Sequence, residues 1–436
     1  MKKLLSSFLA LFFVLSISAF VPGCANNKES ENSELTNIQL DEEETTVKTF
    51  PYIYIDIEEG KEVESKEISL SCIIQITNTD EQYVFSGENA LTAEIRGRGN
   101  STWLMPKKPY RIKFESKTDL FGFGKAKKYT LIANYCDKSL SRNLFAYELA
   151  KEIGLNETTS AQPVNLVVNG VYRGVYLLCE QNEIGKARVN IDSDLNDIDT
   201  GYLLELDSRA VEEGVLNVDY FEMGGNHYAI KDPGTDEDEF TEDHFNFIKT
   251  YLESCFSAIN GTNYDAIKEL IDVESFAKCY IVHELFNCVD VGMTSFYLYK
   301  NAGGKLFAGP VWDFDVSSGN CDYVNNANNV HYLYAKNANV WYRKLLAFDE
   351  FNDLVAELLQ TSKEAINAKI NELVEYQLEY IKNNEANFEV WPIMGIYVWP
   401  NPQELVEINT FEGQVLFLKN WLQQKLSYME EIYSNE

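Results

Sequence analysis

Basic residues and histidine are scarce in this sequence. Among its 436 residues, Lys and Arg number 37 against 68 Asp and Glu, and there are four His, so the formal net charge is −31. A protein of this charge repels the phosphates of nucleic acids and the headgroups of anionic lipids at long range. General binding to nucleic acid is therefore disfavoured, and we expect no nucleic-acid partner.

The motifs of several hydrolase and metal-binding classes are missing. No CxxC pair exists, which leaves a structural zinc site or a thioredoxin-like redox site with little support. His283-Glu284 lacks the second histidine of the HExxH zinc-protease helix, and the sequence contains neither a GxSxG turn nor a Walker loop. We therefore interpret all four histidines as structural or surface residues.

Long hydrophobic runs are limited to the N-terminus. Residues 1–24 have the pattern of an export signal, with Lys2 and Lys3, an apolar stretch, and then Val21-Pro22-Gly23-Cys24. These last four residues resemble a bacterial lipobox, which predicts cleavage and attachment of lipid at Cys24; an uncleaved anchor or an ordinary secretory peptide is the alternative. No other stretch has the roughly 18 apolar residues that span a bilayer. We expect a protein tethered outside the cytoplasmic membrane by its lipid alone.

The remaining cysteines show no pairing pattern. Without Cys24 their number is seven, so at least one has no disulfide partner within the chain. A chain of this length can form a hydrophobic core large enough to fold without disulfide bonds. We interpret most of them as small core residues: Cys72, Cys136, Cys179, Cys255, Cys279, Cys288 and Cys321.

The sequence is rich in hydrophobic residues. Hydrophobic residues make up 45% and aromatic residues 13%, enough to build a core. The length fits about two lobes. After the signal, residues 25–48 are polar and acidic and predict a solvated tether. We divide the rest into a β-rich lobe, 49–183, and a mainly helical lobe, 184–436, an α+β architecture.

The expected strands are concentrated in the first lobe. Residues 52–57, 68–77 and 90–96 have strand composition, and 110–114 alternates with period two. Asn169-Gly170 lies between the runs 164–168 and 171–179, and this dipeptide favours a type I′ hairpin turn. Between these strands, residues 138–153 have helical apolar spacing and end at Gly154. Strands are also expected over 202–206, 296–300 and 305–311.

The second lobe is dominated by helical patterns. They cover residues 245–259, 264–271, 273–286, 351–382 and 411–432. Residues 232–243 are strongly acidic and predict a solvated loop. Trp391 and Trp399 flank a proline-containing connection, and we expect them to pack rather than to form a platform for carbohydrate.

A basic segment interrupts the acidic chain. From Arg96 to Lys113 there are six basic residues and no acid. Gly97 and Gly99 in the same segment would let backbone amides approach an oxyanion. One interpretation is a site for an anionic ligand; the other is a basic strand face that pairs with acids elsewhere. The residue pattern leaves both open.

A group of carboxylates lies far downstream. Asp290 follows a predicted helix, whereas Asp313 and Asp315 follow the hairpin formed by the strands 296–300 and 305–311. This arrangement lets the acids converge on one point. Carboxylates are the hard oxygen ligands that suit Mg²⁺, and two of them beside a phosphate are usual in phosphoryl transfer. Asp residues at strand ends also serve as turn caps, so the pattern alone is weak evidence.

Five separated motifs together resemble the CotH kinase family, named for spore coat protein H. They occur in order between about residues 50 and 320. The resemblance implies an atypical, bilobal protein-kinase-like fold and transfer of phosphate from ATP to Ser or Thr of exported proteins. The motifs are Arg96-Gly-Arg-Gly-Asn-Ser-Thr-Trp103, Pro106-Lys-Lys-Pro-Tyr-Arg-Ile-Lys-Phe114, Asp137-Lys-Ser-Leu-Ser-Arg-Asn143, Asn169-Gly-Val-Tyr-Arg-Gly-Val-Tyr176 with Glu180, and Gly309-Pro-Val-Trp-Asp-Phe-Asp315.

The resemblance assigns roles to the acids. Asp290 matches the catalytic-loop aspartate that orients or deprotonates the acceptor hydroxyl. Asp313 matches the metal-binding aspartate, and Asp315 is the second acid of that motif. The implied cofactors are ATP and Mg²⁺, with Mn²⁺ as an alternative ion.

The nucleotide-binding residues are assigned with less detail. Lys108 or Lys113 would hold the nucleotide phosphates, assisted by Arg98. The strand that ends at Glu180 would run into the hinge, where backbone groups receive adenine.

One position departs from the kinase pattern. A kinase catalytic loop has a metal-binding Asn five residues after its Asp, and position 295 is Ser. Two hypotheses follow: an ATP-dependent surface kinase, or a kinase-like scaffold or adhesin that binds a protein or glycan without turnover. The acids and the basic segment favour the kinase, whereas Ser295 favours the scaffold.

Overall fold

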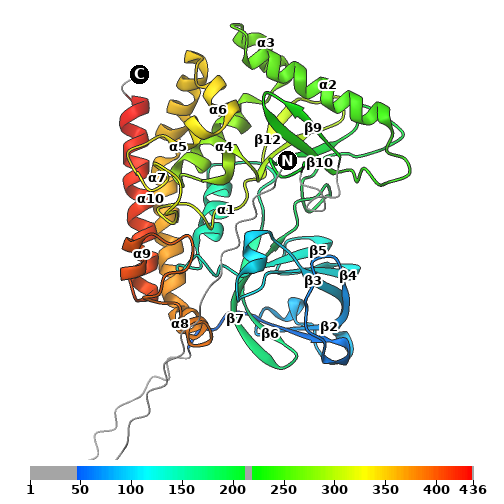
Figure 1. The fold of residues 1–436 in the computed structure, drawn as a ribbon, viewed down its shortest axis with the longest axis vertical. Helices are drawn as coiled ribbons and strands as arrows, with labels where there is room; N and C mark the ends of the chain where they lie inside the picture. Colours follow the sequence, from blue (N-terminus) through cyan, green and yellow to red (C-terminus); the bar gives the residue numbers. More distant parts are fainter. Residues whose placement is uncertain (1–46, 212–218, 435–436) are drawn as a thin grey trace, which may run out of the picture. The chain divides into compact units, whose positions relative to one another are not determined.

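The computed structural model describes residues 47–211 and 219–434 (Figure 1). The expected signal, the lipid-accepting Cys24 and residues 25–46 of the expected tether lie outside these ranges. Within them, no helix has both the length and the apolar composition needed to cross a membrane.

The first seven strands close into a barrel. Its strand order is β1-β2-β3-β4-β5-β7-β6, and parallel pairing of β1 with β6 closes it. Alternate residues point inward, as Ile53, Ile55 and Ile57 do on β1. The strands are β1 (Tyr52–Ile57), β2 (Leu70–Thr77), β3 (Leu91–Gly97), β4 (Tyr110–Asp119), β5 (Lys125–Ile132), β6 (Ala161–Val168) and β7 (Val171–Glu180).

The hairpin between β6 and β7 confirms the turn prediction. Asn169 and Gly170 have φ values of 50° and 77°, and a type I′ turn requires positive φ at both positions. The helix α1 (Arg142–Glu152) begins four residues later than predicted. The reason is Asp137, whose carboxylate accepts hydrogen bonds from the backbone N–H groups of Ser139, Ser141 and Arg142 and so shapes a turn before the helix.

A second sheet follows the barrel. Its order is β12-β11-β8-β10-β9. Two of its strands, β9 (Tyr220–Met223) and β10 (Asn226–Asp232), were not predicted, so this part contains more β-structure than expected. The strands β8 (Tyr202–Leu206) and β11 (Phe296–Lys300) have the predicted bounds, whereas β12 (Leu306–Ala308) is shorter than the predicted strand 305–311.

Helices surround this sheet and continue to the C-terminus. The long helices α7 and α10 lie side by side (Figure 1), and Lys425 of α10 forms a buried ion pair with Glu284 of α4. Helix bounds are α2 (Glu242–Ile259), α3 (Tyr264–Leu270), α4 (Val273–Leu285), α5 (Tyr334–Ala338), α6 (Val340–Leu345), α7 (Asp349–Glu379), α8 (Ile381–Val390), α9 (Gln403–Glu407) and α10 (Phe411–Ser434).

Buried histidine and cysteine serve the core, as expected. The Nδ1 atom of His283 lies 2.8 Å from the Tyr342 hydroxyl, and burial lowers the pKa of His283 to about 3. This histidine is therefore neutral and structural at physiological pH. The seven cysteines of the described ranges are all buried and unpaired.

The architecture is thus mixed α/β, with a closed barrel followed by a sheet and helices. The expected division into a β-rich and a mainly helical part holds only in outline, because β8 to β12 form a sheet inside the second part. The closed barrel also differs from a clearly bilobal kinase arrangement. Its closure depends on the long-range pairing of β1 with β6, which local patterns do not reveal.

Candidate functional site

A cavity of about 470 Å³ lies between the barrel and the second sheet. One wall is the loop after β3, where Arg98, Gly99 and Thr102 line the cavity. The opposite wall carries the predicted acids, which come from the 3-10 turn η5 (Asp290–Gly292) and the segment after β12. Two regions that are about 190 residues apart in the chain therefore face the same space.

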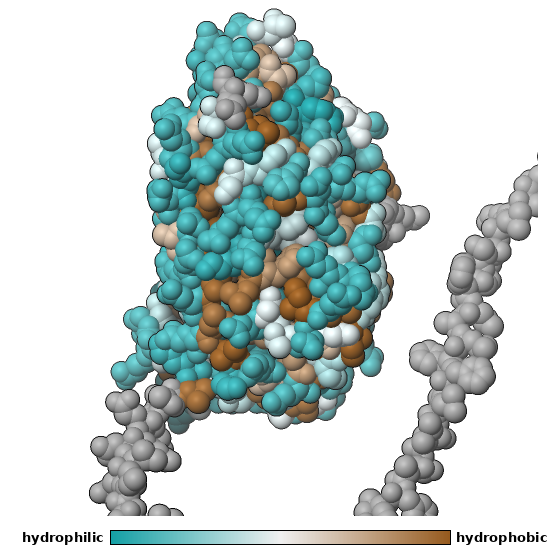
Figure 2. Space-filling view, turned by 90° about the vertical axis from the view of Figure 1, so that its left-hand side faces the viewer, coloured by the Kyte–Doolittle hydropathy of each residue, from teal (hydrophilic) through white to brown (hydrophobic). Residues whose placement is uncertain are grey.

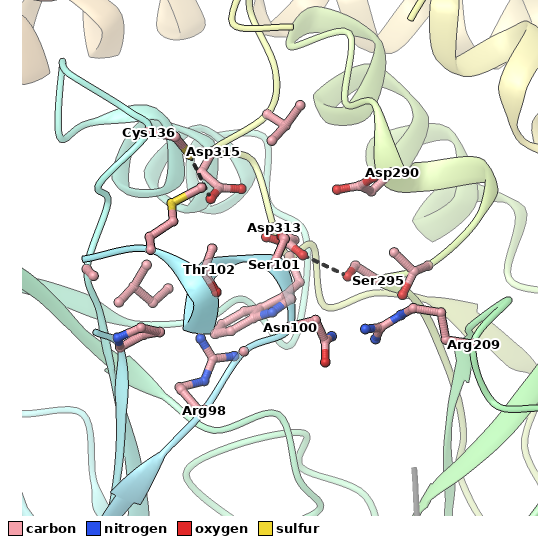
Figure 3. A pocket seen from close by; sticks show the side chains of 18 of the residues that line it. Arg98, Asn100, Ser101, Thr102, Cys136, Arg209, Asp290, Ser295, Asp313 and Asp315 are labelled. Carbon is pink, nitrogen blue, oxygen red and sulfur yellow. Dashed lines mark hydrogen bonds between the residues drawn. The ribbon is translucent and has the colours of Figure 1, made fainter. Parts of the chain in front are cut away.

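The three acids converge as their positions predicted. Figure 3 shows Asp290, Asp313 and Asp315 around one space. The hydroxyl of Ser295 donates a hydrogen bond to Oδ2 of Asp313 at 3.1 Å, and Cys136 Sγ donates to Oδ2 of Asp315 at 3.4 Å. The convergence is a matter of geometry, and the catalytic and metal-binding roles of these acids stay predictions.

The acids carry more negative charge than their surroundings compensate. Burial, and next the charge of Asp313, raises the pKa of Asp290 to about 7, while Arg209 acts in the opposite direction. Burial also raises the pKa of Asp315 well above its usual range, and Asp313 and Asp290 add to this effect. A cation in the cavity would relieve the repulsion.

The donor set fits a divalent cation that keeps part of its water shell. Carboxylate oxygens are the ligands that Mg²⁺ and Mn²⁺ prefer. Among the described residues, no group of three or more His, Cys, Asp or Glu side chains is placed closely enough to hold an ion by itself. Mg²⁺ in nucleotide sites commonly takes one or two carboxylates and completes its shell with phosphate oxygens and water, so Asp313 and Asp315 are sufficient protein ligands.

The segment that carries Asp313 and Asp315 is held by the start of α1. Asn143 Oδ1 accepts a hydrogen bond from the Phe314 backbone N–H at 2.8 Å. Arg142 donates from Nε to Ser317 O at 3.0 Å and from Nη2 to Ser318 O at 3.2 Å. Asp313 itself has a φ of 70°, a conformation that costs energy and persists only where neighbouring contacts fix it.

Arg142 and Asn143 belong to the motif Asp137–Asn143, to which the sequence analysis assigned no role. Arg142 is completely buried and pairs with the equally buried Asp137. The motif Asp137–Asn143 therefore joins the barrel to the acidic segment through α1. The signal in the sequence was a basic residue and an amide at the start of a predicted helix, but their partners 170 to 180 positions later were not predictable.

The lysines expected to hold phosphate do not line the cavity. Lys108 Nζ donates to Trp103 O at 2.7 Å, and its ammonium group lies 5.2 Å from the centre of the Trp103 ring. Lys113 is exposed on β4, because Ile112 and Phe114 on either side of it point into the barrel. The structure brings neither lysine to the acids.

Lys107 lines the cavity in their place, although it is only 1% exposed. Its ammonium group donates to Val175 O and to Asn387 Oδ1, and it lies 4.5 Å from the centre of the Tyr176 ring. Burial without a carboxylate partner lowers the pKa of Lys107 well below its usual range. Its contacts join the barrel to α8.

Arg98 is the predicted phosphate-binding residue that does reach the cavity. Its guanidinium group lies 5.7 Å from the centre of the Trp312 ring, next to Asp313 in the chain (Figure 3). Gly99 has a φ of 81°, where a side chain would be strained. Gly97 has a different reason: a Cβ there would lie 2.4 Å from the Trp103 ring, so this glycine makes room for tryptophan rather than for an anion.

Glu180 lies outside the main cavity. It forms a buried ion pair with Arg188 and accepts a hydrogen bond from Ser160 N at 2.7 Å. Burial raises its pKa. The next residue, Gln181, does line the cavity, so the strand β7 ends at the expected place while the side chain of Glu180 serves the structure.

Several cavity residues were missed by the sequence analysis. Arg209 and Lys231 bring positive charge to the side opposite the barrel, and Arg209 points into the cavity (Figure 3). Lys231 pairs with Glu205 at 2.8 Å, and Glu205 Oε1 also accepts a hydrogen bond from Ser295 N at 3.1 Å. For Glu205 and Arg209 the signal was charged residues in and just after the predicted strand β8, whereas Lys231 lies on β10, which was not predicted.

Comparison with known proteins agrees with the geometry. No curated protein matches the chain. A family model described as CotH kinase protein matches residues 95–429, which include both walls of the cavity and most of the chain. The match shows a kinase-like protein, and the chain belongs to the CotH kinase protein family.

Proposed function

We propose that this protein is an ATP-dependent kinase that phosphorylates Ser or Thr residues of exported proteins. The observation that carries the proposal is the cavity in which three carboxylates face Arg98 and the loop after β3. Family membership gives the kinase-like character. The transfer of phosphate from ATP, the acceptor and the place outside the cytoplasm are parts of the proposal.

Each wall of the cavity has a part in the proposed reaction. Asp290 accepts the proton of the acceptor hydroxyl while the oxygen of that hydroxyl forms a bond to the γ-phosphorus. The bond between the γ-phosphorus and the β–γ bridging oxygen breaks at the same time, which releases ADP. Asp313 and Asp315 would hold a divalent cation, whose positive charge would stabilise the phosphate oxygens. Arg98 and the loop of Gly99 and Asn100, which line the cavity, would bind the phosphates.

Ser295 has a specific part in this arrangement. Its N–H binds Glu205 and its hydroxyl binds Asp313, so it orients a metal-binding acid instead of supplying an amide ligand. We infer that the proposed reaction needs only the cation that Asp313 and Asp315 would hold, and that Ser295 is not a ligand of a second metal ion. The barrel, which ends at Glu180, would correspond to the nucleotide-binding lobe (49–183) and the rest to the second lobe (184–436).

The proposed location rests on the sequence of the N-terminus. The signal-like residues 1–24 and Cys24 would place the protein at the outer face of the bacterial cell membrane, held only by lipid. Mass spectrometry of the mature protein tests this directly. A lipid-modified N-terminal peptide that begins at Cys24 is expected, and an unmodified chain that retains residues 1–23 would overturn the proposed anchor.

The kinase proposal is tested with labelled ATP and Mg²⁺. We expect transfer of label to a mixture of exported proteins, or to the protein itself, and loss of transfer in Asp290→Asn and Asp313→Asn. Asp56→Asn, on the exposed face of β1, is a matched control that should behave as the unchanged protein. Equal labelling by all variants, or none by any, would overturn the proposal.

A non-catalytic scaffold is the second candidate. It is favoured by the absence of Lys108 and Lys113 from the cavity lining and by serine at position 295. The scaffold would bind a protein or glycan partner without turnover. Binding of nucleotide or partner with no transfer of label would support it over the kinase.

A further inference from the structure

Four large side chains are exposed together beside the cavity. Tyr323, Ile396, Tyr397 and Trp399 are 48%, 54%, 54% and 42% exposed, and we call them the mouth platform. Tyr323 and Trp399 also line the cavity that contains the acids. Figure 2 shows hydrophobic residues gathered in the lower half of the face that α8 and α9 help to form. Trp399 therefore differs from its expected role as a packing residue.

The platform is held in place by hydrogen bonds. Lys138 Nζ donates to Ile396 O at 2.6 Å, and the Tyr397 hydroxyl donates to Asp322 Oδ2 at 2.7 Å. Asn401, two residues after Trp399, donates from Nδ2 to Cys136 O at 2.7 Å. The rings of Tyr323 and Trp399 stack with their centres 5.3 Å apart and their planes at 26°. Exposed hydrophobic groups fixed in this way are typical of a binding surface.

The platform lies on the side of Asp290. The small hydrophobic cluster that contains Val289 also contains Val316 and Cys321, so the segment leading to Tyr323 packs against the residue before Asp290. The Tyr334 hydroxyl donates to Val289 O at 3.2 Å and ties the end of this segment to the same point. Arg98 and the phosphate-facing loop come from the other wall, on the barrel.

We propose that the mouth platform binds a hydrophobic or aromatic side chain next to the acceptor Ser or Thr of a polypeptide substrate. This inference rests on the proposed kinase function. An acceptor hydroxyl that reaches Asp290 brings its neighbouring residues past Tyr323 and Trp399. An aromatic or aliphatic neighbour would cover these rings and remove apolar surface from water.

The chemistry of the platform favours a polypeptide over a sugar. Tyr323 and Trp399 stack on each other, so each ring has one broad face covered. The carboxylate of Asp322 accepts the hydrogen bond of Tyr397, and Ile396 adds only aliphatic surface. A sugar ring needs an open aromatic face and several polar partners, whereas the edge of a phenylalanine ring needs neither.

The experiment measures peptide binding to the full chain and is independent of turnover. Two fluorescent peptides share a central Ser and differ only in having Phe or Gly on both sides of it. Fluorescence anisotropy with Mg²⁺ and a non-hydrolysable ATP analogue gives their dissociation constants. We expect the Phe peptide to bind roughly tenfold more tightly, because a partly buried aromatic ring contributes about 1.5 kcal/mol.

Variants locate this preference on the platform. Trp399→Ala and, separately, Tyr323→Ala should reduce it to about twofold or less, and Trp399→Phe, which keeps a ring, should retain most of it. Leu104→Ala, which is 81% exposed on the barrel side, is the matched control and should change nothing. The affinity for the ATP analogue should stay within about twofold in all four variants.

Three results would overturn the proposal. They are equal binding of the two peptides by the unchanged protein, a preference that survives in both alanine variants, and a parallel loss of affinity for the ATP analogue, which would assign the rings to nucleotide. Failure of the kinase function has a different signature: the Phe peptide binds with the expected preference, but no peptide receives phosphate from ATP.

Discussion

The basic segment of the barrel, Arg96 to Lys113, and the acidic segment on the opposite side of the cavity differ in how their charges are compensated. In the basic segment most cations are already engaged: Lys107 donates to two oxygen atoms, Lys108 donates to Trp103 O, and Arg96 donates to Lys66 O at 2.6 Å. On the opposite wall the acids repel one another, and the pKa values of Asp290 and Asp315 are raised. A run of charge in the sequence therefore indicates a site only where the structure leaves the charge without a partner.

The largest expected effect tests this difference directly by neutralising one charged group from each segment. Asp313→Asn should reduce phosphate transfer by roughly 10³-fold, because a group that acts on the charge of the transition state contributes on that scale. Lys113→Met should change transfer by less than about twofold, since Lys113 lies exposed on the barrel. Initial rates at saturating ATP measure both effects.

The next effect concerns stability. Arg142→Met removes one partner of a buried ion pair and leaves Asp137 charged in the core. We expect the free energy of unfolding to fall by about 3 kcal/mol, as is usual when one buried partner is lost. Urea denaturation measures the change. Arg173→Met, which breaks the partly exposed pair with Glu62, is the matched control and should cost less than about 1 kcal/mol.

A double variant sharpens that result. In Arg142→Met/Asp137→Asn the charge of Asp137 is also removed, so part of the lost stability should return. A cost that is equal in the single and double variants would show that the hydrogen bonds of Arg142 to Ser317 and Ser318, rather than its charge, stabilise the fold.

A smaller effect is expected from a residue that only positions the acids. Asn143→Leu keeps the size of the side chain but removes the acceptor for Phe314 N. We expect the affinity for Mn²⁺ and the rate of transfer to fall by about tenfold to a hundredfold, as for other groups that orient metal ligands. The measurements are Mn²⁺ titration by electron paramagnetic resonance and the kinetics of transfer.

A purely structural role for Asn143 predicts a different outcome. The melting temperature would fall, while the Mn²⁺ affinity of the folded fraction would stay unchanged. Asn371→Leu, at a half-buried position on α7, controls for the general effect of exchanging an amide for leucine.

These comparisons also show what the sequence could reveal. The hairpin of β11 and β12 made the convergence of Asp290 and Asp313 predictable, because a hairpin returns the chain to where it started. The period-two pattern of β4 already indicated that Lys113 points outward, and this could have excluded Lys113 as a phosphate-binding residue. Successive side chains of a strand point to opposite faces, so Lys113, between the inward-pointing Ile112 and Phe114, lies on the outer face of the barrel.

Other features depend on contacts that local patterns do not contain. The strand β5 was missed because its first half is rich in lysine, and its pairing with β4 and β7 decides its structure. The roles of Asn143 and Arg142 depend on partners more than 170 residues away. The exposure of Trp399 depends on where Lys138 and Asn401 fix its loop.

The smallest expected effect concerns the pH dependence of stability and a buried acid that does not line the cavity. Asp232, at the end of β10, accepts a hydrogen bond from Ile184 N at 2.7 Å. Burial raises its pKa from 3.8 to about 6, although this hydrogen bond and Lys128 act in the opposite direction. The folded protein therefore holds this proton more tightly than the unfolded chain does.

The sign of the pH dependence follows from that difference. Between about pH 4 and pH 6 the folded state binds more protons at Asp232, so this residue's contribution to stability falls as the pH rises and then stays level. Asp232→Asn removes this pH-dependent contribution. The free energy of unfolding of the variant, measured relative to that of the unchanged protein, should therefore be about 1 to 2 kcal/mol higher at pH 7 than at pH 4. Urea denaturation at a series of pH values measures it, with Glu222→Gln on the exposed face of β9 as the matched control. A variant whose stability follows the unchanged protein in parallel across this range would show that Asp232 is solvated like an ordinary surface carboxylate, and that uncompensated acids are confined to the cavity.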